Sequence, residues 1–299
     1  MVNITTIKKD FKRNWVVYLI ALPVVVFFAV FAYAPMVGVL MAFQNYQIKG
    51  GFLGSPWIGL KNFTDFFKSY YFGRLIWNTF ILSFYDLLFG FPAPILFALL
   101  MNELRSVRYK RVVQTITYMP YFISIVVIAG IIKDFFSSNG AITLLLGSTS
   151  NLIGNVSSFR SIFVGTNIWQ FLGFNSVIYM AALSGVDQEL YDAAALDGAG
   201  RLGKALHVTL PSIMSTIIIL LILRIGNLLT VSFEKILLLY APSTYSVSDV
   251  ITTFTYRKGL LESNYGYSTA VGLFNSALNF LMLVTANFTS KKLTETSLF

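Results

Sequence analysis

Long uninterrupted apolar runs are the feature of this sequence that most limits its fold. A helix needs about 20 apolar residues to cross the hydrocarbon core of a bilayer. Strands of a membrane β-barrel would instead alternate apolar and polar residues, and these runs do not alternate. The sequence therefore predicts an all-α, polytopic membrane bundle in one domain, residues 1–299. Its six transmembrane helices are expected at about residues 16–43, 75–101, 112–132, 162–183, 212–233 and 270–288.

Composition supports a chain that lies in lipid. Of its residues, 56% are hydrophobic and only 12% are charged, whereas a soluble domain carries about a quarter charged residues. The basic residues before the first run are reminiscent of a signal peptide, but residues 16–43 are too many for its apolar region. We therefore expect an uncleaved first helix.

Basic residues predict the orientation of the bundle. With the N-terminus inside, twelve Lys and Arg fall on the cytoplasmic side in short segments, and the smaller number on the opposite side is spread over longer loops. This bias follows the positive-inside rule and places both termini in the cytoplasm. The outer group includes Lys235, in a segment from Phe233 to Ser268 that we expect to fold back partly into the membrane.

The sequence offers little for catalysis or metal binding. It contains no cysteine, and His207 is its single histidine, so thiol chemistry and most zinc or Ser-His-Asp arrangements are excluded. We predict no catalytic residue and no metal site. The net charge of +9 is explained by cytoplasmic Lys and Arg rather than by nucleic-acid binding.

A polar stretch between the fourth and fifth runs, residues 185–211, is predicted to be a cytoplasmic loop with a short helix. Asp187 is a good N-cap, and Gly198 or Gly200 can supply the left-handed residue that ends the helix. Small residues on its surface would let a partner approach closely. The residue types alone leave two interpretations open, a knob that enters a partner's groove and a connector without a partner.

The spacing in this loop resembles the EAA loop of ABC-importer permeases. That pattern is Glu-Ala-Ala, two residues, Asp-Gly-Ala, eight residues, then Ile, any residue and Leu-Pro. Two fixed positions differ, since Asp192 replaces Glu and Val208 replaces Ile. The resemblance implies contact with an ATPase through the loop. The matching residues are Asp192, Ala193, Ala194, Asp197, Gly198, Ala199, Val208, Leu210 and Pro211.

Shorter motifs extend the resemblance over nearly the whole chain. Asn78-Thr79 and Gly90-Phe91-Pro92-Ala93-Pro94 are similar to the carbohydrate permeases of the maltose-importer class, and residues 224–240 to permeases for larger or acidic oligosaccharides. The resemblance implies half of a translocation pore for a carbohydrate, an oligosaccharide with acidic ones included, in a bacterial plasma membrane.

The resemblance also implies partners. They are a second permease subunit, two ATPase subunits and an extracytoplasmic solute-binding protein. The sequence has no phosphate-binding Gly-x4-Gly-Lys-[Ser/Thr] motif, so ATP and Mg²⁺ would be bound by the ATPases and this chain needs no cofactor. Whether the second permease is identical or different stays open.

Polar residues within the runs are candidates for the substrate path, because charges in a membrane usually face a cavity or a partner. Asp86 and Arg224 have an alternative role as an ion pair that holds helices together. Trp169, Tyr121 and Tyr179 could stack on sugar faces, with packing or lipid-interface roles as the alternative. The substrate-path candidates are Tyr85, Asp86, Asn175, Tyr179, Arg224, Asn227 and Glu234.

Other functions fit the sequence less well. An ABC permease for a solute other than a sugar would share the same loop. An ion-coupled secondary carrier predicts repeated halves and buried proton relays, and neither is evident. An intramembrane aspartyl enzyme would need a second carboxylate to pair with Asp86.

Overall fold

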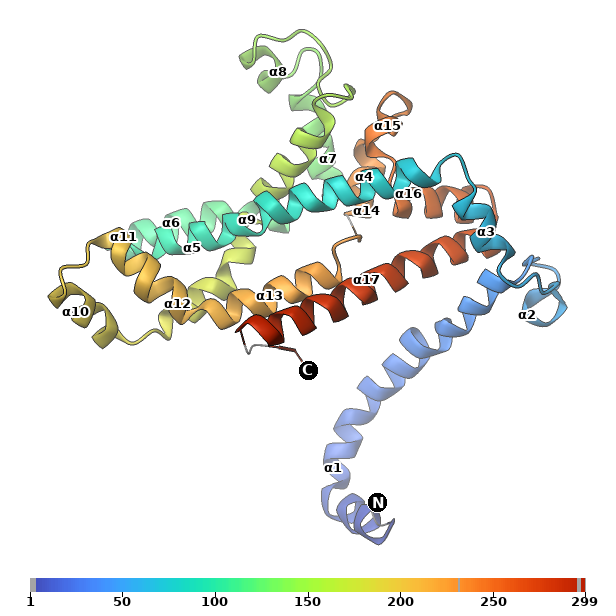
Figure 1. Ribbon diagram of the computed structural model, residues 1–299, viewed down its shortest axis with the longest axis horizontal. Helices are drawn as coiled ribbons and strands as arrows, with labels where there is room; N and C mark the ends of the chain where they lie inside the picture. The colour runs from blue at the N-terminus through green and yellow to red at the C-terminus, as the bar shows by residue number, and fades with distance from the viewer. Residues whose placement is uncertain (1–3, 231, 295–296, 299) are drawn as a thin grey trace. The chain divides into compact units, whose positions relative to one another are not determined.

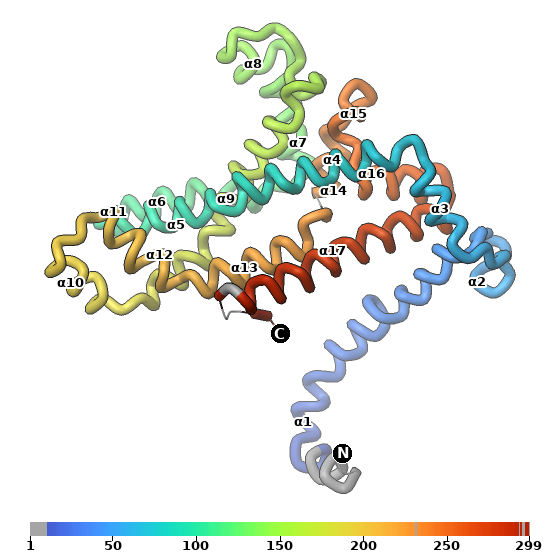
Figure 2. Tube along the Cα trace, viewed as in Figure 1, coloured from blue at the N-terminus to red at the C-terminus, as the bar shows by residue number. Residues whose placement is uncertain are grey.

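The computed structural model describes residues 4–230, 232–294 and 297–298, and most of these are helical. Within these residues the only β-type pairing is an isolated bridge between Gln44 and Trp57. The all-α prediction is confirmed at this level. The chain divides into two compact units, one holding the residues up to Phe66 with Lys258–Leu273, the other Phe67–Arg257 with the residues from Phe274 onward (Figures 1 and 2).

The first unit contains the long N-terminal helical segment. Its most apolar 18-residue window, within Phe11–Phe43, has no buried residue, so that window is open to lipid or to a partner. The carboxamide of Asn62 donates to the carbonyls of Ala42 (2.9 Å) and Gln44 (3.1 Å) and holds the end of the segment. The elements are α1 (Ile4–Phe28), η1 (Ala29–Tyr33), η2 (Ala34–Phe43), α2 (Gly51–Gly54), α3 (Lys61–Phe67), most of η7 (Arg257–Leu261) and the start of α17 (Tyr265–Thr294).

The second unit contains the remaining helices. In Figure 1, α10 and α11 lie at one end of this unit and α15 and α16 near the other. Its elements before the polar loop are α4 (Phe72–Tyr85), η3 (Asp86–Gly90), α5 (Pro92–Asn102), α6 (Val107–Tyr118), η4 (Met119–Phe122), α7 (Ile125–Phe135), α8 (Ala141–Leu145) and α9 (Phe159–Ser184). Those that follow are α10 (Gln188–Leu196), α11 (Arg201–Lys204), η5 (Ala205–Thr209), α12 (Leu210–Ser212), α13 (Met214–Gly226), α14 (Phe233–Leu239), η6 (Pro242–Thr244), α15 (Tyr245–Ser248), α16 (Ile251–Tyr256) and the rest of α17.

Helix α9 is the centre of the second unit, where it packs against α5 and α6. Gly173 allows the approach to α6, because a Cβ atom at this position would collide with the carbonyl oxygen of Thr117. One apolar core surrounds Phe159 and Phe163 of α9, and a second surrounds Tyr179 and Leu183. The same helix therefore carries both cores and positions its polar residues between them.

Two predicted spans are not straight helices. Residues 112–132 bend by 100° between Phe122 and Ile125, where a 3₁₀ turn containing Pro120 ends one helix and the Ser124 hydroxyl caps the next. The segment 212–233 bends by 63° at Ile213 and its helix ends at Gly226. Within the described residues, three helices are long and apolar enough to cross a membrane. The number of possible spans rises to five if each bent pair of helices is counted as one span. The number of six spans and the orientation stay predictions.

Candidate functional site

A cavity of about 610 Å³ lies in the second unit, where η3, α5, α9 and α13 supply most of its wall. This volume is typical of sites for small molecules. The sequence candidates that line it are Asp86, Asn175, Tyr179, Arg224 and Asn227. Two further candidates, Tyr85 and Glu234, are not part of the lining. Tyr85 packs on the apolar core instead, and Glu234 is exposed on α14.

Asp86 is placed at the cavity by an irregularity in its helix. Residues Asp86–Gly90 form a π-helical turn, and Pro92 then begins α5. Because proline has no N–H and disfavours the turn before it, a local widening of the helix is a normal response. The chain stays helical through this wider turn and continues into α5. Gly90 makes room, since a Cβ there would lie 3.2 Å from Asp86 Oδ1.

Asp86 belongs to a group of five polar residues that we call the Asp86 cluster: Asp86, Asn167, Gln170, Arg224 and Lys235. One carboxylate oxygen of Asp86 accepts a hydrogen bond from Asn167 Nδ2 (3.0 Å), and the other pairs with the Arg224 guanidinium. Lys235 Nζ donates to Asn167 Oδ1 (3.0 Å) and to Gln170 Oε1 (3.4 Å). The structure therefore contains the Asp86–Arg224 ion pair that the sequence offered as an alternative role, and both partners belong to this chain.

Lys235 is the functional candidate that the sequence analysis missed. It falls in the segment that we expect on the outer side and partly folded back into the membrane, and its side chain is completely buried. The reason is that α14 packs against α7 and contributes Ile236 and Leu239 to the apolar core. A lysine next to the apolar run Ile236-Leu237-Leu238-Leu239 was the available signal, since buried charges are rare without partners.

Aromatic residues form one side of the cavity. Tyr121 and Phe174 both line it, and their rings stack with centroids 3.7 Å apart. Flat apolar faces of this kind suit the C–H faces of sugar rings. Trp169, another sequence candidate for stacking, is 46% exposed and does not contribute to the lining.

The polar loop forms the short helix that the sequence predicts. Asp187 caps α10 by accepting from the Glu189 N–H at 3.0 Å, and Gly198 has a left-handed φ of 81° just beyond its end. No residue of α10 is buried, and Leu196 is 90% exposed.

The second half of the loop has a different position. Val208, Leu210 and Pro211 lie in η5 and α12, beyond the exposed helix. Leu210 packs on the core around Tyr179 and Leu183. These three residues therefore connect the exposed helix to the cavity wall, while Asp192, Ala193, Ala194, Asp197, Gly198 and Ala199 lie in or next to α10.

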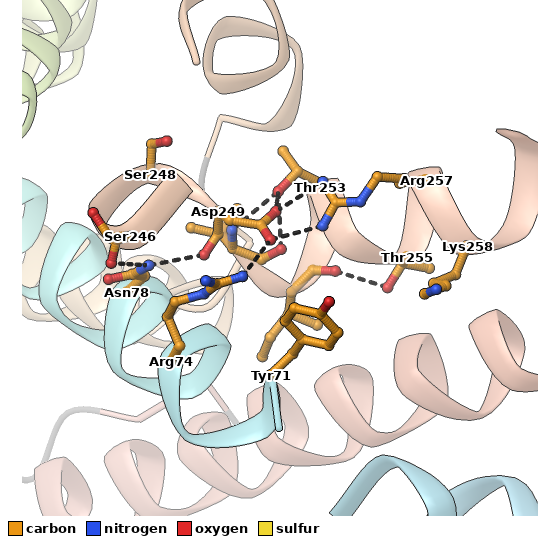
Figure 3. Close-up of polar contacts among 12 residues, drawn as sticks. Tyr71, Arg74, Asn78, Ser246, Ser248, Asp249, Thr253, Thr255, Arg257 and Lys258 are labelled. Atoms are coloured by element: carbon orange, nitrogen blue, oxygen red, sulfur yellow. Dashed lines mark hydrogen bonds and ion pairs between the residues drawn. The ribbon is translucent and has the colours of Figure 1, made fainter. Parts of the chain in front are cut away.

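A second polar group, which we call the Asp249 cluster, lies at the junction of α15 and α16 (Figure 3). The fully buried Asp249 carboxylate pairs with Arg257 (2.7 Å) and Arg74 (3.6 Å). Asn78 donates to the carbonyls of Ser246 and Asp249, both at 3.1 Å. The cluster thereby fixes α15 and α16 to α4.

The charge of Arg257 is supported by this arrangement. Burial lowers the pKa of the guanidinium, but the hydrogen bond and the negative charge of Asp249 raise it, and the net direction is upward. Arg257 also lies over the rings of Tyr245 and Phe254, at 5.3 and 5.7 Å from their centroids. Arg257 therefore keeps its positive charge beside Asp249.

Comparison with known proteins identifies the family of the chain. Residues 90–295 match the family described as the binding-protein-dependent transport system inner membrane component, and the chain belongs to this family.

Close relatives cover almost the whole chain. It is 42% identical over 96% of its length to protein LplB of Bacillus subtilis, of which the match covers 92%. It is 39% identical to the polygalacturonan/rhamnogalacturonan transport system permease protein YteP of the same organism, over 94% of this chain and 89% of that protein.

A solved structure is similar over the same extent. A chain of a bacterial ABC transporter involved in the import of the acidic polysaccharide alginate superposes with a TM-score of 0.90 and 41% identity, over 97% of this chain and 99% of that one. A chain of a bacterial alginate ABC transporter in complex with an alginate pentasaccharide-bound periplasmic protein superposes with a TM-score of 0.89. The chain is thus a permease of the ABC importer class.

Proposed function

We propose that this chain forms one half of the translocation pore of a bacterial ABC importer for an oligosaccharide. The observation that carries the proposal is α10, a short exposed helix that bears the EAA-loop spacing. Two relatives support a sugar as the solute, because they are named as permeases of polygalacturonan/rhamnogalacturonan and arabinooligosaccharide transport systems. ABC permeases for other solutes share this loop, so the substrate is the part that experiment must decide.

Coupling to ATP hydrolysis takes place at α10. Asp192, Ala193, Ala194, Asp197, Gly198 and Ala199 form the surface that enters a groove of an ATPase subunit, and Leu196 adds an apolar contact. Val208, Leu210 and Pro211 pass the movement on, because Leu210 packs on the core below the cavity. Rigid-body motion of this kind alternates the access to a substrate site.

The cavity at the Asp86 cluster is a segment of the substrate path. Asp86, Asn175, Arg224 and Asn227 offer polar groups to sugar hydroxyls, and Tyr179 lines the same wall. The stacked Tyr121 and Phe174 rings offer an apolar face. A few placed polar groups in an otherwise apolar wall are what a sugar site requires.

The complete transporter contains further subunits. A second permease supplies the other half of the pore, two ATPases bind ATP and Mg²⁺, and an extracytoplasmic protein delivers the sugar. The chain lies in the plasma membrane with six spans and both termini in the cytoplasm. The position of α10 at one end of the second unit and of α15 and α16 near the other is compatible with loops on opposite sides of the membrane.

The proposal is tested by reconstitution. The chain, its companion permease, the ATPase and the binding protein are placed in liposomes, and uptake of labelled oligosaccharides is measured with ATP and with a non-hydrolysable analogue. ATP-dependent uptake of an oligosaccharide is the expected result. Uptake of a non-sugar solute alone, or uptake driven by an ion gradient without ATP, would contradict it.

A further inference from the structure

Lys235 is a buried amine whose described contacts include no carboxylate. The ion pairs of the described residues do not include it. Its Nζ atom instead meets two carboxamide oxygens, Asn167 Oδ1 and Gln170 Oε1, and lies 5.7 Å from the centroid of the Phe163 ring. A cation at such a site is costly unless it is compensated, so its presence next to a cavity calls for a function.

Asn167 transmits the effect of Lys235 to Asp86. A lysine amine only donates to a carboxamide oxygen, so the Asn167 oxygen faces Lys235. Its NH₂ group must then face Asp86, as the 3.0 Å contact shows. Lys235 thus stabilises the Asp86 carboxylate across one side chain.

The charges of the Asp86 cluster do not cancel. Arg224 and Lys235 are formally cationic, and Asp86 is the single carboxylate among the five residues. Glu234 is exposed and does not line the cavity. Lys235 is fully buried, whereas the Arg224 side chain is 47% exposed and lines the cavity. Arg224 therefore presents the surplus positive charge to whatever occupies the cavity.

We propose that Arg224 binds the carboxylates of an acidic oligosaccharide in the cavity, and that Lys235 is the positioning residue that makes it available by offsetting Asp86 through Asn167. A guanidinium offers paired N–H groups that match a carboxylate. This inference rests on the proposed function and names the substrate class of that site. Without Lys235 the formal charges of Asp86 and Arg224 cancel, so Arg224 has no surplus positive charge to present to the cavity.

The test compares two sugars of the same length, trigalacturonate and its methyl ester, in the reconstituted transporter. Each is supplied at a concentration that saturates the binding protein, so that the permease determines the difference in uptake rate. We expect Lys235→Met to lower the ratio of acid to ester uptake by about tenfold, while Lys235→Arg keeps most of the ratio. Lys133→Met, at an exposed position of α7, is the matched control and should leave the ratio unchanged.

A second variant should change the ratio of acid to ester uptake in the opposite direction. Asp86→Asn keeps the shape and removes the negative charge, so the ratio should rise or hold even if the overall rate falls. Loss of both uptakes in proportion in Lys235→Met, or a falling ratio in Asp86→Asn, would overturn the inference. If Lys235→Met does not assemble, the Asp86→Asn ratio decides. Failure of the wild-type transporter to take up either sugar would instead contradict the proposed function.

Discussion

At the scale of single residues, buried polar groups organise the second unit. Asp86 and Asp249 are each nearly or fully buried and each meets an arginine. Breaking such a pair costs more than the pair contributes, because the remaining charge stays buried. The two clusters differ in their surroundings, since Asp86 lines the cavity and Asp249 joins α4 to α15 and α16. We therefore expect one to affect transport and the other stability.

Replacement of Asp249 by asparagine should destabilise the protein. The arginines at positions 74 and 257 lose their carboxylate, and the expected loss is about 2–3 kcal/mol, below the value for fully buried pairs because both side chains are partly exposed. Thermal unfolding in detergent measures the shift. Glu262→Gln breaks the exposed Lys258–Glu262 pair of 2.6 Å and should cost no more than about 0.5 kcal/mol. Equal shifts in the two variants would contradict the ranking.

Residue patterns predicted some of these positions and not others. Asp187 was predictable as the start of a short helix, and Gly198 or Gly200 as its end, because capping is local, and the structure has the left-handed residue at Gly198. The pair of Asp86 with Arg224 could only be offered as an alternative, since a sequence does not show which helices meet. Lys235 was missed because its burial depends on the packing of α14 against α7. The role of Asn167 could not be predicted, because it depends on contacts with both Lys235 and Asp86 that only the folded chain forms.

At the scale of elements, the close approach of α9 to α6 depends on one glycine. Gly173→Ala should force the helices apart at Thr117 and cost about 1–3 kcal/mol, as overpacking does. Gly165→Ala in the same helix is the matched control, because a Cβ there meets nothing within 4 Å. It should be neutral or stabilising by up to about 1 kcal/mol, since alanine favours a helix. Unfolding of both variants checks the difference, and equal effects would contradict the close approach.

The coupling helix α10 gives a second element-scale prediction. Gly198→Asp should abolish stimulated ATP hydrolysis and uptake while insertion into the membrane is retained, because the left-handed turn beside the proposed docking surface then carries a strained, charged side chain. Gly200→Asp adds the same charge at a residue with an ordinary φ of −72° and should keep a larger part of the activity. Normal uptake by Gly198→Asp would count against the docking role.

At the scale of the whole molecule, the helical class followed from the long apolar runs, but the course of the spans did not. Pro120 and Ser124 turn one expected span by 100°, and such bends depend on neighbours that satisfy the backbone. Helix α9 carries the polar residues Asn167 and Gln170 in an otherwise apolar stretch, and the structure accounts for them because both bind Lys235. Length and hydropathy therefore predict where apolar segments lie, and packing decides their shape.

The predicted orientation can be measured because the chain contains no cysteine. A cysteine in place of Leu145, which is 85% exposed in α8, should react with a membrane-impermeant maleimide in intact cells. A cysteine in place of Leu202, which is 72% exposed beside α10, should react only after the membrane is opened. The reverse pattern would place the coupling loop outside.

The most direct measurement of the central claim is cross-linking of α10 to the ATPase. Leu196→Cys supplies the only thiol of this chain, at a 90% exposed position. In inside-out vesicles that contain the assembled transporter, the account predicts a cross-link from this thiol to a nucleotide-hydrolysing subunit, with a yield that changes when ATP is added. Absence of that cross-link in a transporter that still imports its sugar would contradict the account.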